Sequence, residues 1–317
     1  MEKYIAITGG VGGAKLCLGF AHLLTPEQVA FVVNTGDDFR HLGLHISPDL
    51  DTLMYTLGGL SNPDMGWGRE HETWNFITAL KQLGGDSWFN LGDVDLATHV
   101  MRTQMLAAGS TLTEVTATLS GQLGIEHQLF PMSDDPVRTI VHTETGALAF
   151  QHYFVRERCA PVVTGFEFDG TDEAALSPQI HAWLDDPDLA GVVICPSNPF
   201  VSIDPILAIQ EFADWLRASP VPVVAVSPIV RGEAIKGPTA KMMQELSVPA
   251  TADAVAEHYQ DFIDGFIIDQ QDASLADRIV ALHIETIAVQ TVMVTLADRI
   301  ELARTAIDFL HRLRREE

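Results

Sequence analysis

The chain has 317 residues, of which 47% are hydrophobic and 20% are charged, and its formal net charge is −24. This composition is typical of a folded protein with a sizeable core, and it excludes an intrinsically disordered chain. The excess of acidic side chains disfavours nucleic acid and anionic membranes as partners. No apolar run reaches the length of a membrane span, and the N-terminus lacks a signal-peptide pattern, so we expect a cytoplasmic protein.

The first residues predict a phosphate-binding turn. Residues 4–7 favour a strand, a glycine-rich turn follows, and residues 14–24 have the apolar spacing of a helix. At such a turn the backbone N–H groups bind a diphosphate, and glycine lets the phosphate approach them closely. The spacing matches neither common nucleotide-binding motif, so a tight turn without a ligand stays an alternative. The predicted contacts are Gly9, Gly10, Gly12, Gly13 and the cation Lys15.

Three later apolar runs, at 28–33, 191–195 and 222–226, also end in polar residues. Strands that alternate with helices predict an α/β fold, a Rossmann-like doubly wound parallel sheet whose ligands bind beyond the carboxyl ends of the strands. We expect a nucleotide-binding domain from 1–60 and 166–317, and an inserted helical and small-sheet cap at 61–165 that closes over it. The polar residues expected at the nucleotide are Asn34, Thr35, Asp37, Ser197, Asn198 and Ser227.

Compact pairs of carboxylates are the next feature. Asp37 and Asp38 follow the second predicted strand, Asp49 and Asp51 share the segment ISPDLDT, and Asp93 and Asp95 share LGDVDL. A single such pair is most often solvated surface, but pairs of this spacing also suit Mg²⁺, which bridges phosphates. The predicted magnesium ligands are Asp49 and Asp51, and Asp93 and Asp95 are further candidates for ligand binding.

Basic and aromatic residues give weaker predictions. Arg102, Lys236 and Lys241 are candidate clamps for phosphate or carboxylate, although a solvated surface cation is an equal alternative for each lysine. Trp67, Trp88 and Phe89 could stack on a planar ligand or belong to the core. An interior or surface role is the better interpretation of His99, His41 and His45.

Six ordered blocks of sequence resemble the CofD family, the 2-phospho-L-lactate transferases of coenzyme F420 biosynthesis. They include GGVGGAKL, VNTGDDFRHLGLHISPDLDTLMYTL, WFNLGDVDLATHVMRT and PSNPFVSIDPILAI. The resemblance implies transfer of a phosphoacid-phosphoryl unit from a guanosine diphosphate-activated donor to the terminal hydroxyl of the deazaflavin Fo, with release of GMP. It also implies Mg²⁺, a homodimer, and a donor acid that is 2-phospholactate, phosphoenolpyruvate or 3-phosphoglycerate. In family terms Asp51 contacts Fo, whereas residues 9–13 and the polar strand ends contact the nucleotide.

The roles of the acids stay open at this level. Asp49 or Asp51 would hold Mg²⁺, and one of these or Asp38 would orient the attacking hydroxyl, because both roles require a carboxylate. A UDP-sugar-binding regulatory protein of a related family with a similar glycine opening is the alternative function. An NAD(P)-dependent oxidoreductase is disfavoured, because the glycine spacing is wrong.

Overall fold

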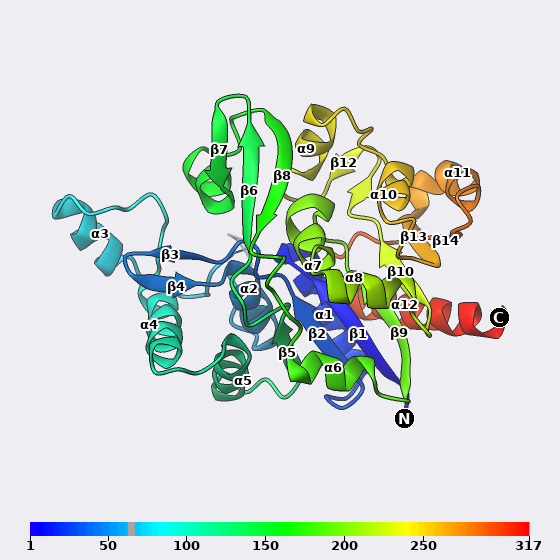
Figure 1. The fold of residues 1–317 in the computed structure, drawn as a ribbon, viewed down its shortest axis with the longest axis horizontal. Coiled ribbons are helices and arrows are strands. Elements are labelled where there is room, and N and C mark those ends of the chain that lie inside the picture. The colour runs from blue at the N-terminus through cyan, green and yellow to red at the C-terminus, as the bar shows by residue number, and fades with distance from the viewer. Residues whose placement is uncertain (63–66, 317) are drawn as a thin grey trace.

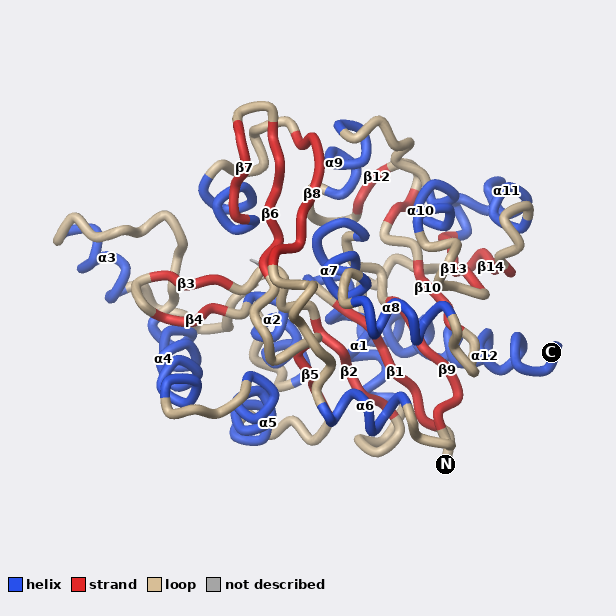
Figure 2. Tube along the Cα trace, in the orientation of Figure 1, coloured by secondary structure: helices blue, strands red, loops and turns tan. Residues whose placement is uncertain are grey.

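The computed structural model describes residues 1–62 and 67–316, and its centre is a parallel sheet of seven strands. The strand order is β14-β13-β10-β9-β1-β2-β5, and every neighbouring pair is parallel (Figures 1 and 2). The strands of this sheet are β1 (Lys3–Thr8), β2 (Val29–Val33), β5 (Gln128–Pro131), β9 (Leu189–Ile194), β10 (Val223–Val226), β13 (Gly265–Asp269) and β14 (Glu285–Val289).

Helices cover both faces of the sheet, as a parallel sheet requires. Tyr4 and Ala6 of β1 belong to one buried cluster, whereas Ile5 and Ile7 belong to the other. The first cluster includes residues of α1 (Gly10–Leu23), α2 (Pro48–Leu57), α5 (Leu112–Gln122) and α12 (Leu296–Glu316). The second includes residues of α6 (Pro178–Leu184), α8 (Gln210–Arg217), α9 (Thr239–Glu245), α10 (Ala252–His258) and α11 (Ala276–Val280).

The two helices α1 and α12 pack tightly together. A Cβ atom on Gly19 of α1 would collide with the backbone of Arg299 in α12. This close approach anchors the C-terminal helix on the helix that follows the glycine turn.

Several smaller elements surround the carboxyl ends of the sheet. The antiparallel sheet β7-β6-β8 stands above it, and the hairpin β3–β4 points toward α3 and α4, which project from the body (Figure 1). Their bounds are β3 (Phe39–His41), β4 (Leu44–Ile46), α3 (Asn75–Gln82), α4 (Asp93–Ala107), β6 (Arg138–Thr143), β7 (Gly146–Ala149) and β8 (Val163–Asp169). The remaining short elements are η1 (His152–Arg156), η2 (Pro199–Ile203), α7 (Asp204–Leu207), β11 (Ile229–Val230), β12 (Glu233–Ala234) and η3 (Gln270–Leu275). Within the described residues no helix is both long and apolar enough to cross a bilayer.

The expected α/β fold is confirmed, and the four predicted strands are β1, β2, β9 and β10. The expected boundary of the cap differs from the sheet in one respect. β5 lies inside 61–165, yet it pairs with β2 and forms an edge of the central sheet. The segment 61–165 is therefore not wholly separate from the nucleotide-binding sheet, because its residues Leu129 and Phe130 are buried in the two sheet cores.

Candidate functional site

The glycine turn lies where the strand order of the sheet reverses. β1 pairs with β2 on one side and with β9 on the other, and doubly wound sheets bind ligands beyond the strand ends at such a point. A Cβ atom on Gly9 would collide with the side chains of Asp49 and Ser202, one on Gly12 with the backbone of Pro196, and one on Gly13 with the side chains of Thr8 and Ser197. Gly10 differs, because its φ is +63° and a Cβ atom at this residue would lie 3.9 Å from its nearest neighbour. Packing within the protein thus requires three of the glycines, and Gly10 leaves open space at the turn.

Three buried carboxylates gather beside this turn. Asp37 and Asp38 follow β2, and Asp49 lies in the first turn of α2. The side-chain amide of Asn34 donates to Oδ2 of Asp49 over 3.0 Å and to Oδ1 of Asp37 over 3.4 Å, while Gln151 donates to Oδ2 of Asp37 over 3.0 Å. Among the described residues neither Asp37 nor Asp49 forms an ion pair with Lys or Arg. Their negative charges are therefore held by neutral amides alone.

Burial and mutual repulsion make these acids unusual. Burial raises the pKa of Asp37 well above its usual range, and the charges of Asp49 and Asp38 add to the shift. Burial also raises the pKa of Asp49 to about 6, although the amide of Asn34 and the backbone of Gly10 oppose that shift. A cation placed between the carboxylates would relieve both effects.

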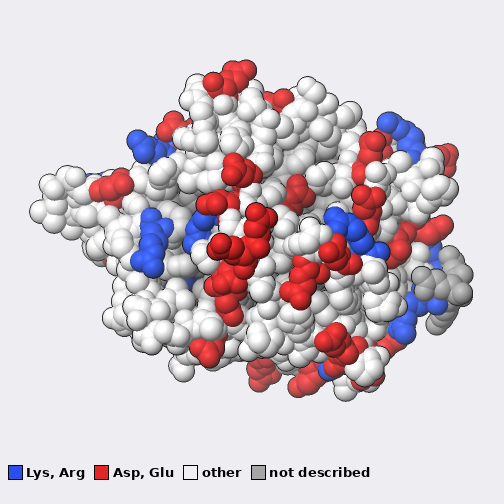
Figure 3. All heavy atoms as spheres, viewed as in Figure 1, with Lys and Arg blue, Asp and Glu red and all other residues white. Residues whose placement is uncertain are grey.

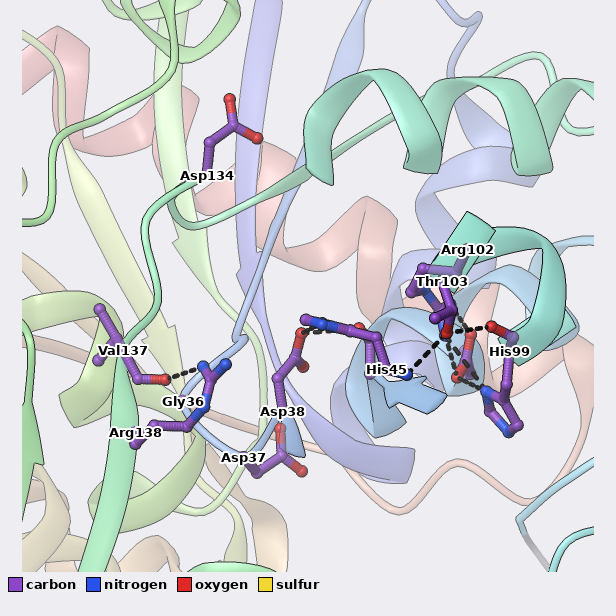
Figure 4. Close-up of polar contacts among 12 residues, drawn as sticks. Gly36, Asp37, Asp38, His45, His99, Arg102, Thr103, Asp134, Val137 and Arg138 are labelled. Carbon is purple, nitrogen blue, oxygen red and sulfur yellow. Dashed lines mark hydrogen bonds and ion pairs between the residues drawn. The ribbon is translucent and has the colours of Figure 1, made fainter. Parts of the chain in front are cut away.

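Asp38 is held differently from its two neighbours. Its Oδ2 accepts a hydrogen bond from the hydroxyl of Ser47 over 2.6 Å and lies 3.0 Å from Nε2 of His45. Its Oδ1 is buried without a hydrogen-bond partner in the described part of the chain. Figure 4 shows the Asp38 carboxylate in contact with His45, whereas the Asp37 carboxylate lies apart from His45.

Asp51 lies on another side of α2 and belongs to a second network. Both of its carboxylate oxygens accept hydrogen bonds from the guanidinium of Arg102, which is buried on α4. His99 lies between Asp51 and Asp95, with ring nitrogens 3.7 Å and 3.3 Å from their oxygens. The hydroxyl of Tyr55 donates to Oδ1 of Asp95 over 2.5 Å. Asp51, Asp95 and His99 have the geometry of a candidate metal site, but Arg102 already supplies a positive charge there.

The structure thus assigns Asp49 and Asp51 to different surroundings. Residues two apart on a helix point in different directions, and here one faces the glycine turn while the other faces α4. Ser47 and Pro48 open a helix at this point rather than only a turn. Arg102 pairs with Asp51 in the interior, so its guanidinium is engaged within the protein and is not a free clamp.

Asp93 lies at the start of α4 and caps α3. Its carboxylate accepts hydrogen bonds from the backbone N–H groups of Asn75 and Phe76 and from the hydroxyl of Thr73. These bonds lower its pKa to about 2. Both carboxylate oxygens are engaged, so the structure gives Asp93 an architectural role.

The polar residues at the other strand ends shape their own loops. The hydroxyl of Ser197 donates to the carbonyl of Gly9 over 2.7 Å, and Oδ1 of Asn198 accepts from the N–H of Phe200 over 3.0 Å. The hydroxyl of Ser227 accepts from the N–H of Ile229 over 3.1 Å, and Thr35 is buried beside Asn34. All of these residues lie at the carboxyl ends of β1, β2, β9 and β10, which is where the sequence predicts them.

Three cations gather near α1, the helix that follows the glycine turn. Nζ of Lys15 lies 3.4 Å from the carbonyl of Met293, in the loop between β14 and α12. Burial lowers the pKa of Lys15, and the nearby charges of Lys236 and Arg299 lower it further. None of these three cations has a carboxylate within ion-pair distance in the described residues. Lys241 lies elsewhere, because it bonds Tyr153 and Glu245.

Aromatic rings pack beside Asp38. Trp88 and Phe89 are half-buried, and their ring centres lie 5.2 Å and 6.0 Å from that of His41. Phe39 is the residue after Asp38, and its ring centre lies 4.9 Å from that of Phe89. Trp67 is separate from this group and contacts Trp74.

The sequence does not predict four residues of these networks as site residues. They are His45, Ser47, Gln151 and Arg299. Gln151 is 114 residues from Asp37, and no local pattern joins them. One local feature could have indicated His45 and Ser47: a short hairpin that starts directly after Asp38 returns the chain toward Asp38 at these residues.

Comparison with known proteins decides the family. Residues 5–304 match the family model described as 2-phospho-L-lactate transferase CofD. The chain belongs to the CofD family. A Kitasatospora aureofaciens protein named phosphoenolpyruvate transferase is 39% identical over 98% of this chain and 99% of its own length. A Methanosarcina mazei protein named 2-phospho-L-lactate transferase is 37% identical over 84% of this chain and 87% of its own length.

A solved structure agrees with the CofD fold. A protein of the UPF0052 family from Bacillus halodurans aligns over 97% of this chain and 99% of its own with a TM-score of 0.65. The sequences are 14% identical, so this likeness bears on the fold alone. The sequence-based identification of the family is confirmed, and the chain is a CofD-family transferase.

Proposed function

We propose that this CofD-family transferase moves a phosphoacid-phosphoryl unit from a guanosine diphosphate-activated donor to the terminal hydroxyl of Fo, releasing GMP, in coenzyme F420 biosynthesis. The names of the relatives support this reaction class, and two relatives that match 98% of this chain are named phosphoenolpyruvate transferases. Phosphoenolpyruvate is therefore the first donor acid to test, followed by 2-phospholactate and 3-phosphoglycerate. We also propose a cytoplasmic homodimer.

Two groups of charged residues near the glycine turn are the observation that best supports this proposal. Lys15, Lys236 and Arg299 form one group, and Asp37 and Asp49, which share the side-chain amide of Asn34, form the other. A diphosphate at the turn would meet backbone N–H groups and the cations of the first group. In phosphoryl transfer, catalysis consists mostly of positioning and charge neutralisation, which this arrangement suits.

The acidic group fits a divalent cation. Asp37 and Asp49 are buried and share the amide of Asn34, and their side-chain donors are neutral amides. We propose these two residues as the Mg²⁺ ligands, in place of the pair Asp49 and Asp51 expected from the sequence. Bound Mg²⁺ would neutralise negative charge on the donor phosphate oxygens. The negative charge of Asp51 is already neutralised by its ion pair with Arg102.

The acceptor would approach from the side of the aromatic rings. Trp88 and Phe89 form an apolar surface next to the acids, and a planar deazaflavin could pack against it. The oxygen of the terminal hydroxyl would then bond to the phosphorus of the phosphoacid unit. That phosphorus would lose its bond to the bridging oxygen, which would leave with GMP, and the hydroxyl proton would pass to a base or to solvent.

Mass analysis of the products tests the proposal. The protein is incubated with Fo, Mg²⁺, GTP, a guanylyltransferase and one of the three phosphoacids at a time. We expect a product whose mass equals Fo plus the phosphoacid unit, together with GMP. Lys15→Gln should reduce product formation, whereas Lys81→Gln on the exposed face of α3 should not.

Two results would contradict the proposal. One is the absence of a new Fo-containing product with every phosphoacid. The other is tight binding of a UDP-sugar without any binding of GDP, which would favour the regulatory alternative.

A further inference from the structure

Asp38 is oriented by its neighbours in the site, and the role that this orientation suggests rests on the proposed transfer reaction. Among Asp37, Asp38, Asp49 and Asp51, only Asp38 has a buried carboxylate oxygen without a hydrogen-bond partner in residues 1–62 and 67–316. The whole side chain is 1% exposed. A buried oxygen of this kind costs free energy, so it calls for an explanation, such as a bound ion or water molecule, local strain or a catalytic role.

The other oxygen of Asp38 is firmly held. Oδ2 accepts from the hydroxyl of Ser47 over 2.6 Å, and Nε2 of His45 lies 3.0 Å away. An ionised carboxylate only accepts hydrogen bonds, so Nε2 of His45 carries the hydrogen. With Oδ2 fixed by two donors, the direction of Oδ1 is fixed as well.

His45 is itself held in place by two elements. It lies in β4, opposite Arg40 in the hairpin with β3. Its backbone N–H donates to the hydroxyl of Thr103 over 2.8 Å, and that hydroxyl donates to the carbonyl of His99 over 2.7 Å. Figure 4 shows this chain of contacts running from Asp38 through His45 to α4. The side chain of His45 is 13% exposed, so little water competes for Oδ2.

We propose that His45 is a positioning residue that fixes Asp38 with Oδ1 directed at the attacking hydroxyl of the acceptor. Asp38 directly precedes Phe39, whose ring packs against that of Phe89, so a hydroxyl on a side chain of a ring bound at that surface would be directed toward the loop of Asp38. Asp37 and Asp49 are left to the cation, and Asp51 is left to its ion pair with Arg102. The four aspartates thus divide their roles by their hydrogen-bond partners.

Steady-state kinetics of variants at His45 test this inference. Because the bond orients a reacting group, we expect His45→Ala to lower kcat by roughly 10- to 100-fold while KM for the donor changes less than about threefold. His45→Gln places an amide N–H near the same point as Nε2, so it should recover much of the lost kcat. Asp38→Asn should lower kcat at least as much as His45→Ala.

A matched control separates positioning from folding. His142→Ala removes a histidine that pairs with Glu167 on the exposed antiparallel sheet, and its kcat should equal that of the wild type. Urea unfolding of each variant shows whether the fold is intact. If His45→Ala fails to fold, His45→Gln tests the positioning role instead. This variant keeps an N–H donor, so a kcat below about 1% of the wild-type value would contradict positioning by that donor.

Three further outcomes are informative. A folded His45→Ala variant with kcat within about twofold of wild type overturns the inference and leaves the proposed function intact. A loss that is confined to KM also overturns it, because it would indicate uniform binding of substrate. If the wild-type chain forms no product, the proposed function and this inference both fail.

Discussion

The buried pair of Asp51 and Arg102 shows how partners decide the role of a residue. The sequence favours Asp51 as a reacting or metal-binding carboxylate. In the structure its two oxygens face a guanidinium that is 1% exposed. A carboxylate engaged in this way has little capacity left for a metal ion. Its removal would leave Arg102 charged and unpaired in the interior.

Loss of stability is therefore the expected effect of Asp51→Asn. Removal of one member of a buried ion pair costs about 3–5 kcal/mol of unfolding free energy, because the other charge stays buried. Replacing both members, as in Asp51→Leu with Arg102→Met, should cost less than the single change. Urea unfolding at pH 7 measures the unfolding free energy of the single and the double variant. A single variant as stable as wild type would show that the pair contributes nothing to folding.

At the scale of elements, helix α3 depends on a residue far along the chain. Asp93 lies 18 residues after Asn75, yet it accepts the N–H groups at the start of α3. This contact closes the projecting segment onto α4. It also makes the order of α3 depend on the charge of one carboxylate.

The pH dependence of this cap has a definite sign. Hydrogen bonds lower the pKa of Asp93 from 3.8 to about 2 in the folded state. Its contribution is thus present above the unfolded pKa near 4, and it is lost as pH falls toward 2. Amide exchange at Asn75 and Phe76 should be slower in the wild type than in Asp93→Asn at pH 7. The difference should shrink between pH 4 and 2.

Asp172→Asn provides the control for that experiment. Asp172 is exposed in the turn after β8, so exchange at α3 should match that of the wild type at every pH. Equal protection of α3 in wild type and Asp93→Asn at pH 7 would show that the cap does not hold the helix.

Local patterns predict the strands and the meeting of their polar ends well. Residues 28–33 and 222–226 are apolar runs with polar ends, and a parallel sheet necessarily brings such ends to one edge. The same reasoning cannot find Gln151 beside Asp37, because that contact depends on how the antiparallel sheet sits above the central one. It also explains the glycines of the turn only by the close approach of a phosphate, whereas packing within the protein is a second reason. Gly12 and Gly13 are required for packing even without a ligand.

Across the whole molecule, negative charge dominates. The net charge is −24, and carboxylates gather over the middle of the face shown in Figure 3, with few Lys or Arg among them. A diphosphate that carries a further carboxylate must enter this field. Lys15, Lys236 and Arg299 offset only part of the repulsion.

Chelation should consequently stop the transfer reaction. Excess EDTA is expected to abolish turnover, and Mn²⁺ should restore it because it accepts similar oxygen ligands. Added NaCl should not restore it, because diffuse screening cannot bridge two oxygens in a fixed geometry. Turnover and metal content are measured together. Full turnover in EDTA, with negligible bound metal, would contradict the role of the cation.

The position of β5 at the edge of the central sheet limits how segments of this molecule can be deleted or exchanged. A deletion that joins residue 60 to residue 166 would remove β5 and leave the outer backbone groups of β2 unpaired. A bare strand edge pairs readily with other chains, so such a truncated protein would aggregate rather than form a minimal nucleotide binder. Exchange of acceptor recognition between relatives should therefore use breakpoints that retain residues 112–131. Exchange of the segment before α5 or of the antiparallel sheet after β5 would still have to retain Arg102, Thr103 and Gln151, which contact Asp51, His45 and Asp37.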